Sequence, residues 1–241
     1  MDETPVFDLQ SFDPSGIAVV FGASGGIGSA LVAALNDVDH FDAVIGLGRK
    51  SDPRFDLLED AQMKQAVDFA AASGEIRLAI DATGFLHIGD DRPEKSWSEL
   101  DRRSLEHAFA VNAIGPALLM KHLLPHLPRT GKSVFATLSA RVGSVGDNRL
   151  GGWYGYRASK AALNQFVRTA SIELTRRAPD ALCVALHPGT VATDLSAPFA
   201  KTGLKVHTPA QAAGHLLGVV GNLTKGDTGQ FFDWRGDPVP W

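Results

Sequence analysis

A glycine-rich turn between a short apolar run and an amphipathic segment constrains the fold of this chain more than any other sequence feature. The apolar run Ile17–Phe21 has the β-branched character of a buried strand, and Ser29–Asn36 has the periodicity of a helix. Between them the chain reads Gly22-Ala23-Ser24-Gly25-Gly26-Ile27-Gly28. Glycines at such a junction permit a tight turn and let a pyrophosphate approach the backbone, while the helix N-terminus supplies free N–H groups. The turn therefore predicts a dinucleotide-binding site.

Strand-like and helix-like segments alternate along the rest of the chain. Further strands are expected at Ala43–Leu47, Ile76–Ala82, Ser133–Leu138 and Leu182–Leu186, and further helices at Asp60–Ala72, Leu100–Leu127 and Ala158–Arg176. This alternation requires crossover connections, which predicts an α/β protein with a doubly wound parallel sheet and helices on both faces, a three-layer Rossmann fold. Because no linker or repeat is evident, residues 1–241 are expected to form one domain, with 194–209 as a lid over the substrate.

Composition and charge narrow the class of protein. The 241 residues carry 23 Lys and Arg against 27 Asp and Glu, a net charge of −4, and lack the basic cluster of a nucleic-acid-binding protein. The N-terminus does not resemble a signal peptide, and no apolar run approaches the roughly 18 residues that span a bilayer. His122 and His126 are spaced like a zinc pair, but no third ligand is evident. We expect a cytoplasmic protein without a metal, whose partners are small molecules rather than nucleic acid or membrane.

The end of the second expected strand bears on which dinucleotide is bound. Gly48 is followed by two basic residues, Arg49 and Lys50. NAD sites usually place an acidic residue there to bind the ribose 2′-hydroxyl, whereas an arginine accommodates the 2′-phosphate of NADP. The pair therefore favours NADP over NAD, and the alternative is a solvated basic pair with no ligand.

Tyr156 and Lys160 stand at the start of the helix expected at Ala158–Arg176 and share one face of it, because residues four apart are neighbours on a helix. A tyrosine with a pKa of about 10 is a poor proton donor at neutral pH. A neighbouring ammonium lowers that pKa and brings the hydroxyl toward the range of a general acid–base. The pair predicts a proton-transferring site; alone, it could also be an aromatic residue packed at a helix start.

Together these motifs resemble the short-chain dehydrogenase/reductase family, whose glycine motif is T-G-x-x-x-G-x-G and whose active site contains Asn, Ser, Tyr and Lys. The resemblance covers residues 15–234 and includes Asp81-Ala82-Thr83-Gly84 in place of the family's N-N-A-G, Val111-Asn112-Ala113-Ile114-Gly115 for V-N-x-x-G, and Pro188-Gly189-Thr190-Val191-Ala192-Thr193 for P-G-x-V-x-T. Asp56, followed by Leu57, matches the aspartate that meets adenine. Two departures are Phe21 for the family's threonine and Asp81 for an asparagine.

The resemblance implies an NADP(H)-dependent oxidoreductase of the carbonyl reductase type, which transfers a hydride between the nicotinamide and a small carbonyl or alcohol. Tyr156 would exchange a proton with the substrate oxygen, and Lys160 would lower the pKa of Tyr156 and hold the nicotinamide ribose. Asn112 would hold a water that links Lys160 to solvent. The cofactor-binding residues implied are Gly22, Ser24, Gly25, Gly26, Ile27, Gly28, Arg49, Lys50, Asp56, Leu57, Ala82, Thr83, Gly84, Asn112, Tyr156, Lys160, Pro188, Gly189, Val191 and Thr193. The resemblance also implies a homodimer or homotetramer, formed through the long helices.

The family's serine has more than one candidate. The family pattern places it three residues before a glycine, and counting back from Gly143 reaches Ala140, whereas Ser139 lies four residues before. Ser139 is the leading candidate for the residue that hydrogen-bonds the carbonyl. Ser144 is the second, and the third possibility is that the site has lost its serine donor, which would cost on the order of 10²-fold in rate.

A narrower resemblance leaves a second function open. Ser139–Ser144, Gly151–Tyr156 and Phe231–Trp241 are similar to segments of the C-factor-type subgroup, in which some members are described as cell–cell signalling proteins and others as carbonyl reductases. The alternative is therefore a signalling or regulatory protein that binds NAD(P) with little or no catalysis. Replacing Tyr156 by phenylalanine separates the two, because only catalysis depends on the hydroxyl.

Overall fold

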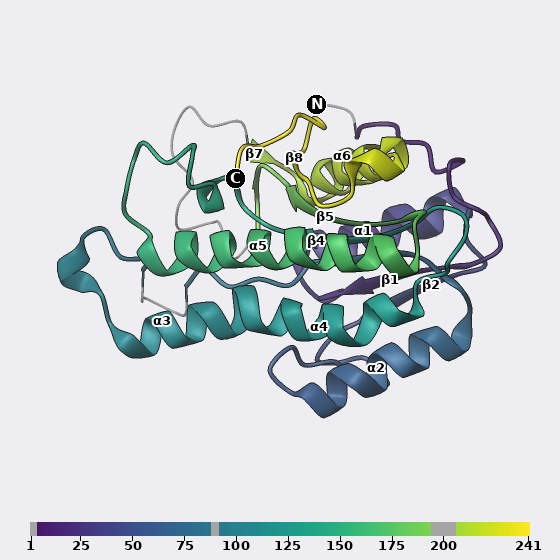
Figure 1. Cartoon of the computed structure of the whole chain (residues 1–241), viewed down its shortest axis with the longest axis horizontal. Helices are drawn as coiled ribbons and strands as arrows, with labels where there is room; N and C mark the ends of the chain where they lie inside the picture. The colour runs from purple at the N-terminus through teal and green to yellow at the C-terminus, as the bar shows by residue number, and fades with distance from the viewer. Residues whose placement is uncertain (1–3, 88–91, 194–205) are drawn as a thin grey trace.

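A parallel β-sheet forms the centre of the molecule (Figure 1). The computed structural model describes residues 4–87, 92–193 and 206–241. The strands of the sheet are β1 (Ile17–Phe21), β2 (Ala43–Leu47), β3 (Ile76–Asp81), β4 (Ser133–Leu138), β5 (Ala181–His187) and β8 (Phe231–Asp233). They lie in the order β2-β1-β3-β4-β5-β8, and every neighbouring pair is parallel. The predicted doubly wound sheet is thus confirmed.

Helices cover both faces of the sheet, which confirms the three-layer prediction. The helices are α1 (Gly26–Val38), α2 (Asp60–Ser73), α3 (Arg102–Phe109), α4 (Gly115–Leu123), α5 (Tyr154–Arg177) and α6 (Pro209–Asn222). Figure 1 shows the helices packed around the sheet. Buried side chains of α1 and α6 form one hydrophobic core with the sheet, and those of α2, α4 and α5 form the other. Short 3₁₀ turns are η1 (Trp97–Glu99), η3 (Leu124–His126), η4 (Arg141–Gly143) and η6 (Lys225–Asp227).

Alternation along the strands divides their side chains between the two cores. In β1, Ile17, Val19 and Phe21 enter the core beneath α2, α4 and α5. Ala18 and Val20 enter the core beneath α1 and α6. Both faces are buried, which is why the sequence shows continuous apolar runs rather than polar alternation. Because the strands are parallel, their C-terminal ends all lie at the same end of the sheet, and polar residues take the place of the apolar ones there.

The helix expected at Leu100–Leu127 is interrupted in its middle. After α3 the chain forms a π-helical turn, η2 (Ala110–Ile114), and α4 follows directly. Pro116 lies in the first turn of α4, and it has no N–H with which to bond the carbonyl of Asn112 in the α-helical pattern. We attribute the wider π-turn to this missing bond. The turn places the Asn112 side chain, which is fully buried, toward the sheet edge.

This interrupted helix is also the one segment among the described residues that is long and apolar enough, by length and composition, to cross a membrane. It runs from Arg102 to His126, and 44% of its most apolar window is buried inside the protein. Leu119 and Leu123 of this segment enter the core shared with α2 and α5. A core helix passes the same test, and the buried face here accounts for the apolar composition.

The segment 194–209, expected as a lid, lies mainly outside the described residues. Its described end holds β7 (Val206–His207), which pairs with β6 (Thr190–Val191) in a separate two-stranded sheet. Thr208 then caps α6 in a capping box with Gln211. Both α6 and β8 are elements that the sequence pattern did not predict.

Candidate active site

The glycine turn has the geometry of a site for a dinucleotide phosphate. Gly22 has a positive φ of 79°, and a Cβ at Gly28 would lie 2.2 Å from the carbonyl oxygen of Gly22. The turn is therefore closed in a form that only glycine allows. Gly25 is the N-cap of α1; no side chain caps this N-terminus, and its first turn contains no acidic residue. The first N–H groups and the positive end of the helix dipole are thus left for an anion.

Residues far along the chain close over this turn, as the sequence predicts for the cofactor site. A Cβ at Gly26 would meet Thr193 Cγ2 at 2.7 Å. Gly189 has a positive φ of 79°, which lets the chain turn after Pro188 at the end of β5, and Val191 then pairs with β7. The segment 188–193 therefore lies against the start of α1, where a bound dinucleotide would contact both.

The two basic residues predicted to distinguish NADP from NAD are exposed beside the turn. Arg49 and Lys50 follow β2, and a Cβ on the preceding Gly48 would lie 3.3 Å from Ser24 Oγ. Neither side chain forms an ion pair with another described residue. Asp56 accepts a hydrogen bond from the Leu58 N–H at 3.1 Å, and Leu57 is buried against Gly115. These groups surround the end of the site where the adenosine would lie.

Asn112 fixes the strand end beside the turn. Its Oδ1 accepts a hydrogen bond from the Phe85 N–H, and its Nδ2 donates to the Phe85 carbonyl, both at 2.8 Å. Nδ2 also donates to Ser159 Oγ on α5 at 3.2 Å. Residues 82–84 lie just before this clamp, and a Cβ at Gly84 would lie 3.9 Å from both Asn112 Oδ1 and Lys160 Nζ. The structure therefore brings the predicted Ala82, Thr83, Gly84, Asn112 and Lys160 together.

Lys160 is a buried cation with a single hydrogen bond among the described residues. Its side chain is 3% exposed, and Nζ donates to the Leu138 carbonyl at the end of β4 over 2.7 Å. Burial lowers the pKa of Lys160 to about 8, and the charge of Asp81 opposes that shift. Two of the three N–H donors of the ammonium are thus still available to a ligand.

Tyr156 carries a hydroxyl with no hydrogen-bond partner among the described residues. The ring is partly buried and meets Trp153 edge-on, with the centroids 6.2 Å apart. Burial raises the pKa of Tyr156 to about 12. The expected lowering by Lys160 is therefore not seen in this structure, because burial outweighs it and the ammonium is turned to the Leu138 carbonyl. The hydroxyl is protonated at neutral pH and open to a ligand.

The two candidate serines are both engaged within the protein. Ser139 Oγ donates to Asn164 Oδ1 over 2.6 Å, and Asn164 is two helical turns beyond Tyr156 on α5. Ser144 Oγ accepts from the Asp147 N–H at 3.1 Å. Ala140, the position that the family spacing gives, is the N-cap of η4 and carries no donor side chain. The structure thus places no free serine hydroxyl beside Tyr156 among these three positions.

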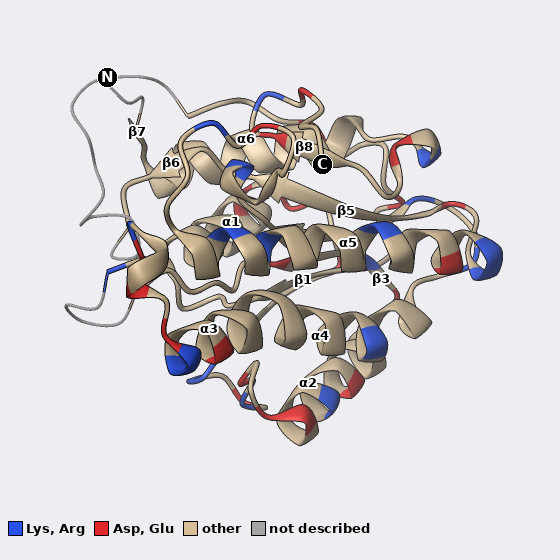
Figure 2. Cartoon of the chain, turned by 60° about the vertical axis from the view of Figure 1, so that its left-hand side comes forward, with Lys and Arg blue, Asp and Glu red and all other residues tan. Residues whose placement is uncertain are grey.

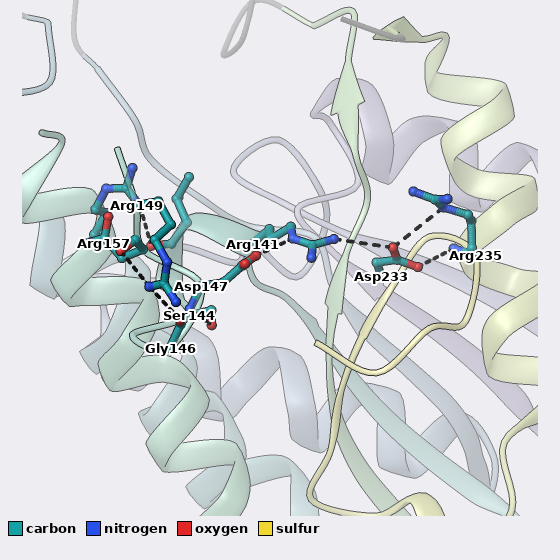
Figure 3. A network of polar contacts seen from close by, with 10 residues as sticks. Arg141, Ser144, Gly146, Asp147, Arg149, Arg157, Asp233 and Arg235 are labelled. Carbon is teal, nitrogen blue, oxygen red and sulfur yellow. Dashed lines mark hydrogen bonds and ion pairs between the residues drawn. The ribbon is translucent and has the colours of Figure 1, made fainter. Parts of the chain in front are cut away.

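A polar network that sequence reasoning missed ties the loop after β4 to β8 (Figure 3). Arg141 Nε donates to Asp147 Oδ2 over 2.6 Å, and Arg141 also lies 3.9 Å from Asp233 Oδ2. Arg235 approaches the same carboxylate at 3.8 Å. Arg157, on the first turn of α5, donates to the Val142 carbonyl. No motif indicated these contacts, and the one that joins the loop to β8, between Arg141 and Asp233, links residues far apart in the chain.

The lysines and arginines of the molecule alternate with acidic residues over its surface rather than forming one basic face (Figure 2). That distribution agrees with the net charge of −4. Among the described residues, no group of three or more His, Cys, Asp or Glu side chains is arranged to hold a metal ion.

Comparison with known proteins gives matches over most of the chain. A family model described as enoyl-(acyl carrier protein) reductase matches residues 23–222. The C-signal protein of Myxococcus xanthus is 37% identical over 143 residues, which cover 59% of this chain and 82% of that protein. A 1-hydroxy-2-glutathionyl-2-methyl-3-butene dehydrogenase of Rhodococcus sp. (strain AD45) is 32% identical over 183 residues, 76% of this chain and 78% of that protein.

Solved structures share the fold. The NADPH-bound carbonyl reductase from chicken fatty liver superposes with a TM-score of 0.81 and 24% sequence identity, and the match covers 99% of this chain and 96% of that one. At this level of identity the likeness is one of fold, and it extends over the whole sheet and both helical layers.

Proposed function

Because the chain belongs to the short-chain dehydrogenase/reductase family of oxidoreductases, we propose that it is an NADP(H)-dependent reductase or dehydrogenase that acts on a small carbonyl or alcohol. The observation that carries this proposal is that the buried Lys160 ammonium and the Asn112 side chain both lie near Gly84, in the segment whose residues Ala82 and Thr83 pack against Gly22 of the glycine turn. Tyr156 stands one helical turn before Lys160 on α5, which supports a proton-transferring site next to the proposed dinucleotide site.

The residues of the chain have distinct roles in binding the cofactor. The turn 22–28 and the N-terminus of α1 bind the pyrophosphate through N–H groups and the helix dipole. Arg49 and Lys50 bind the 2′-phosphate; Asp56 and Leu57 border the adenine; and 188–193 cover the nicotinamide end. When bound, the nicotinamide supplies or accepts the hydride. That a carbonyl reductase of this fold is solved with NADPH bound supports the choice of cofactor.

Tyr156 transfers the proton that the reaction requires. Its pKa of about 12 keeps the hydroxyl protonated at neutral pH but makes it a weak acid, so donation to a carbonyl oxygen that gains charge depends on a neighbouring positive charge that stabilises the phenolate. Lys160 binds the nicotinamide ribose, and its charge stabilises the phenolate left after donation. Asn112 holds the strand end and the water that leads from Lys160 toward solvent.

Ser139 remains the candidate for a second donor to the carbonyl, and in that role it would have to exchange Asn164 for the substrate. The site as folded offers Tyr156 as its open hydroxyl. A reductase with one donor instead of two is expected to be slower by on the order of 10²-fold, with unchanged cofactor binding.

Titration of the purified protein with NADPH and with NADH, followed by fluorescence, tests the cofactor proposal. Arg49→Ala is expected to weaken NADPH by about 10- to 100-fold, the value of one charge-assisted contact, and to leave NADH unchanged. Arg176→Ala is the matched control, since Arg176 is an exposed arginine near the far end of α5. Equal affinity for both nucleotides in the wild type would contradict the role of Arg49, and binding of neither would contradict the proposed function.

The identity with the C-signal protein favours a second candidate function, a signalling or regulatory protein that binds NAD(P) with little catalysis. Both candidates require the cofactor site, but only the enzyme requires the hydroxyl of Tyr156. A screen of small carbonyls with NADPH as reductant separates them, because turnover of any substrate that is lost in Tyr156→Phe supports the enzyme.

We also propose that the protein forms a homodimer or homotetramer through α4 and α5. A groove of about 300 Å³ lies between these helices, and Met120, Phe166 and Leu174 line it. Phe166, which lines this groove, is 41% exposed, so a second copy of the chain would bury it. Light scattering that shows only monomer at micromolar concentration would contradict this proposal.

A further inference from the structure

A carboxylate lies buried beneath the proposed active site, and none of the roles above uses it. Asp81 is the last residue of β3, and its side chain is fully buried. The pattern that the sequence resembles has an asparagine here, which has the same shape without the charge. A buried carboxylate is costly unless hydrogen bonds and an opposite charge stabilise it, so its presence at this position requires a physical explanation.

Three donors surround the two oxygens of Asp81. The N–H of Thr83 donates to Oδ1 at 3.0 Å, and the Thr83 hydroxyl donates to the same oxygen at 2.5 Å. The Thr137 hydroxyl donates to Oδ2 at 2.8 Å. Because a backbone N–H can only donate, Oδ1 is an acceptor. The Thr137 hydroxyl is placed to donate to Oδ2, and donors on both oxygens favour the ionised carboxylate against the effect of burial.

The nearest opposite charge is on Lys160. Strands β3 and β4 pair with Asp81 opposite Thr137, and the next residue of β4, Leu138, accepts the hydrogen bond from Lys160 Nζ at 2.7 Å. The carboxylate and the ammonium therefore lie at adjacent strand ends in one buried region. Burial raises the pKa of Asp81 and lowers the pKa of Lys160 to about 8, and the charge of each opposes the shift of the other.

Other titratable or charged groups on the surrounding elements are engaged elsewhere. Arg141 of η4 pairs with Asp147, Arg157 of α5 donates to backbone carbonyls, Glu94 accepts from the Gly155 N–H, and His107 of α3 packs on the Phe85 ring. Tyr156 is neutral at the pH values considered. Asp81 is thus the charged group of the described residues that acts on Lys160.

We propose that Asp81 is a positioning residue for the proposed reaction: its carboxylate keeps Lys160 in the ammonium form within the protein interior and so sets the upper pH limit of activity. The inference rests on the proposed function for its catalytic part only. An asparagine would keep the hydrogen bonds to one oxygen but would leave the buried ammonium without a counter-charge, and a buried ammonium without a partner loses its proton more easily.

The first experiment measures the ionisation of Lys160 directly in the cofactor-free protein. Lysine labelled with ¹³C at Cε is incorporated, and each signal is titrated by NMR in the wild type and in Asp81→Asn; the Lys160 signal is assigned by its loss in Lys160→Met. We expect the Lys160 pKa to fall by about 1 or more in Asp81→Asn. An unchanged Lys160 pKa would overturn the inference, whatever the protein's activity.

Lys132 is the internal control in the same spectra. Burial also lowers its pKa to about 8, but it lies just before β4, at the opposite end of that strand, where it donates to the carbonyls of Val220 and Gly221. Its titration is expected to be the same in both proteins. Should Asp81→Asn fail to fold, the ¹³Cγ shift of Asp81 in the wild type decides the question, because a protonated carboxyl at pH 7 would overturn the inference.

The second experiment measures the pH profile of carbonyl reduction. Deprotonation of Lys160 removes activity as the pH rises, so Asp81→Asn is expected to move the alkaline limb of kcat/KM to lower pH, with activity near pH 6.5 within about threefold of the wild type. Asp68→Asn, which removes the charge of an exposed carboxylate on α2 that pairs with Lys64, is the matched control and should leave the limb in place. An identical limb in all three proteins overturns the inference, whereas a wild type without any activity contradicts only the proposed function.

Discussion

The two halves of the candidate site differ in how their polar groups are satisfied. In the cofactor-facing half, the N-terminus of α1 has no side-chain cap, and Arg49 and Lys50 have no ion-pair partner among the described residues. In the carbonyl-facing half, residues 139–147, the polar groups bind one another: Ser139 binds Asn164, and Arg141 binds Asp147.

This difference separates the residues proposed to bind the cofactor from those proposed to contact the reacting carbonyl. Hydrogen-bond donors without a protein partner cost free energy unless water or a ligand accepts from them. We therefore expect the cofactor-facing half to bind an anion. In the carbonyl-facing half the side chains hydrogen-bond to one another, which holds residues 139–147 in place but leaves few donors for a substrate. Tyr156, on α5, belongs to neither half by sequence, and its hydroxyl has no hydrogen-bond partner among the described residues. Substitutions can therefore affect one half without the other.

The largest expected effect is that of Tyr156→Phe. Removing the hydroxyl removes the proton donor, so kcat/KM for carbonyl reduction should fall by about 10²- to 10⁴-fold. Because the hydroxyl makes no hydrogen bond to the described protein, the fold is expected to be unchanged, and NADPH affinity should stay within about threefold. Steady-state kinetics and fluorescence titration measure the two quantities. A variant that kept most of its activity would show that the proton comes from elsewhere.

Gly28→Ala is expected to damage the cofactor-facing half selectively. The added Cβ would lie 2.2 Å from the Gly22 carbonyl oxygen, so the turn must shift, and NADPH affinity should fall by about 10²-fold. Gly218→Ala on α6 is the control, because its Cβ would meet Phe7 Cβ at an ordinary 3.7 Å. If Gly28→Ala bound NADPH as tightly as the control, the glycine turn would not be the phosphate site.

The smallest effects concern the carbonyl-facing half. Ala140→Ser adds a hydroxyl at the position that the family spacing gives to serine, and we expect kcat to rise by about tenfold.

Ser139→Ala should change kcat by less than about threefold but reduce the free energy of unfolding by about 1 to 2 kcal/mol, because Asn164 loses its partner. If Ser139 is instead the catalytic donor, Ser139→Ala lowers kcat by about 10²-fold and Ala140→Ser has no benefit.

Local patterns predicted most of the fold. The apolar runs of β1, β3, β4 and β5 are strands buried on both faces, β2 is a partly buried outer strand, and the glycine turn lies where the first strand meets the first helix. The π-turn at Ala110–Ile114 was not predicted, although Pro116 was a usable signal, since its missing N–H removes one helical hydrogen bond. The three residues of β8 are too few to show a pattern, whereas α6 was missed although Thr208, Pro209 and Gln211 are a usable helix-start signal.

Only those residues of the candidate site that belong to sequence motifs could be predicted from the sequence. Tyr156, Lys160 and Asn112 belong to patterns with fixed spacing. By contrast, the pairs Asp81 with Thr137 and Ser139 with Asn164 join residues on separate elements, and nothing in the sequence links them before the sheet has formed. The direction of the Ser139 hydroxyl depends on such a contact, which is why spacing alone left three possibilities open.

The π-turn rotates the helix before it relative to the helix after it. Each residue advances an α-helix by about 100°, so one additional residue within a turn rotates the preceding segment by that amount relative to the following one. The buried faces of α3 and α4 are therefore offset by one residue, and Asn112 lies within the turn that produces this offset. Removing one residue between Asn112 and Pro116 would rotate Asn112 by about 100° relative to α4 and turn it away from Phe85. In this segment the count of residues matters as much as their identity.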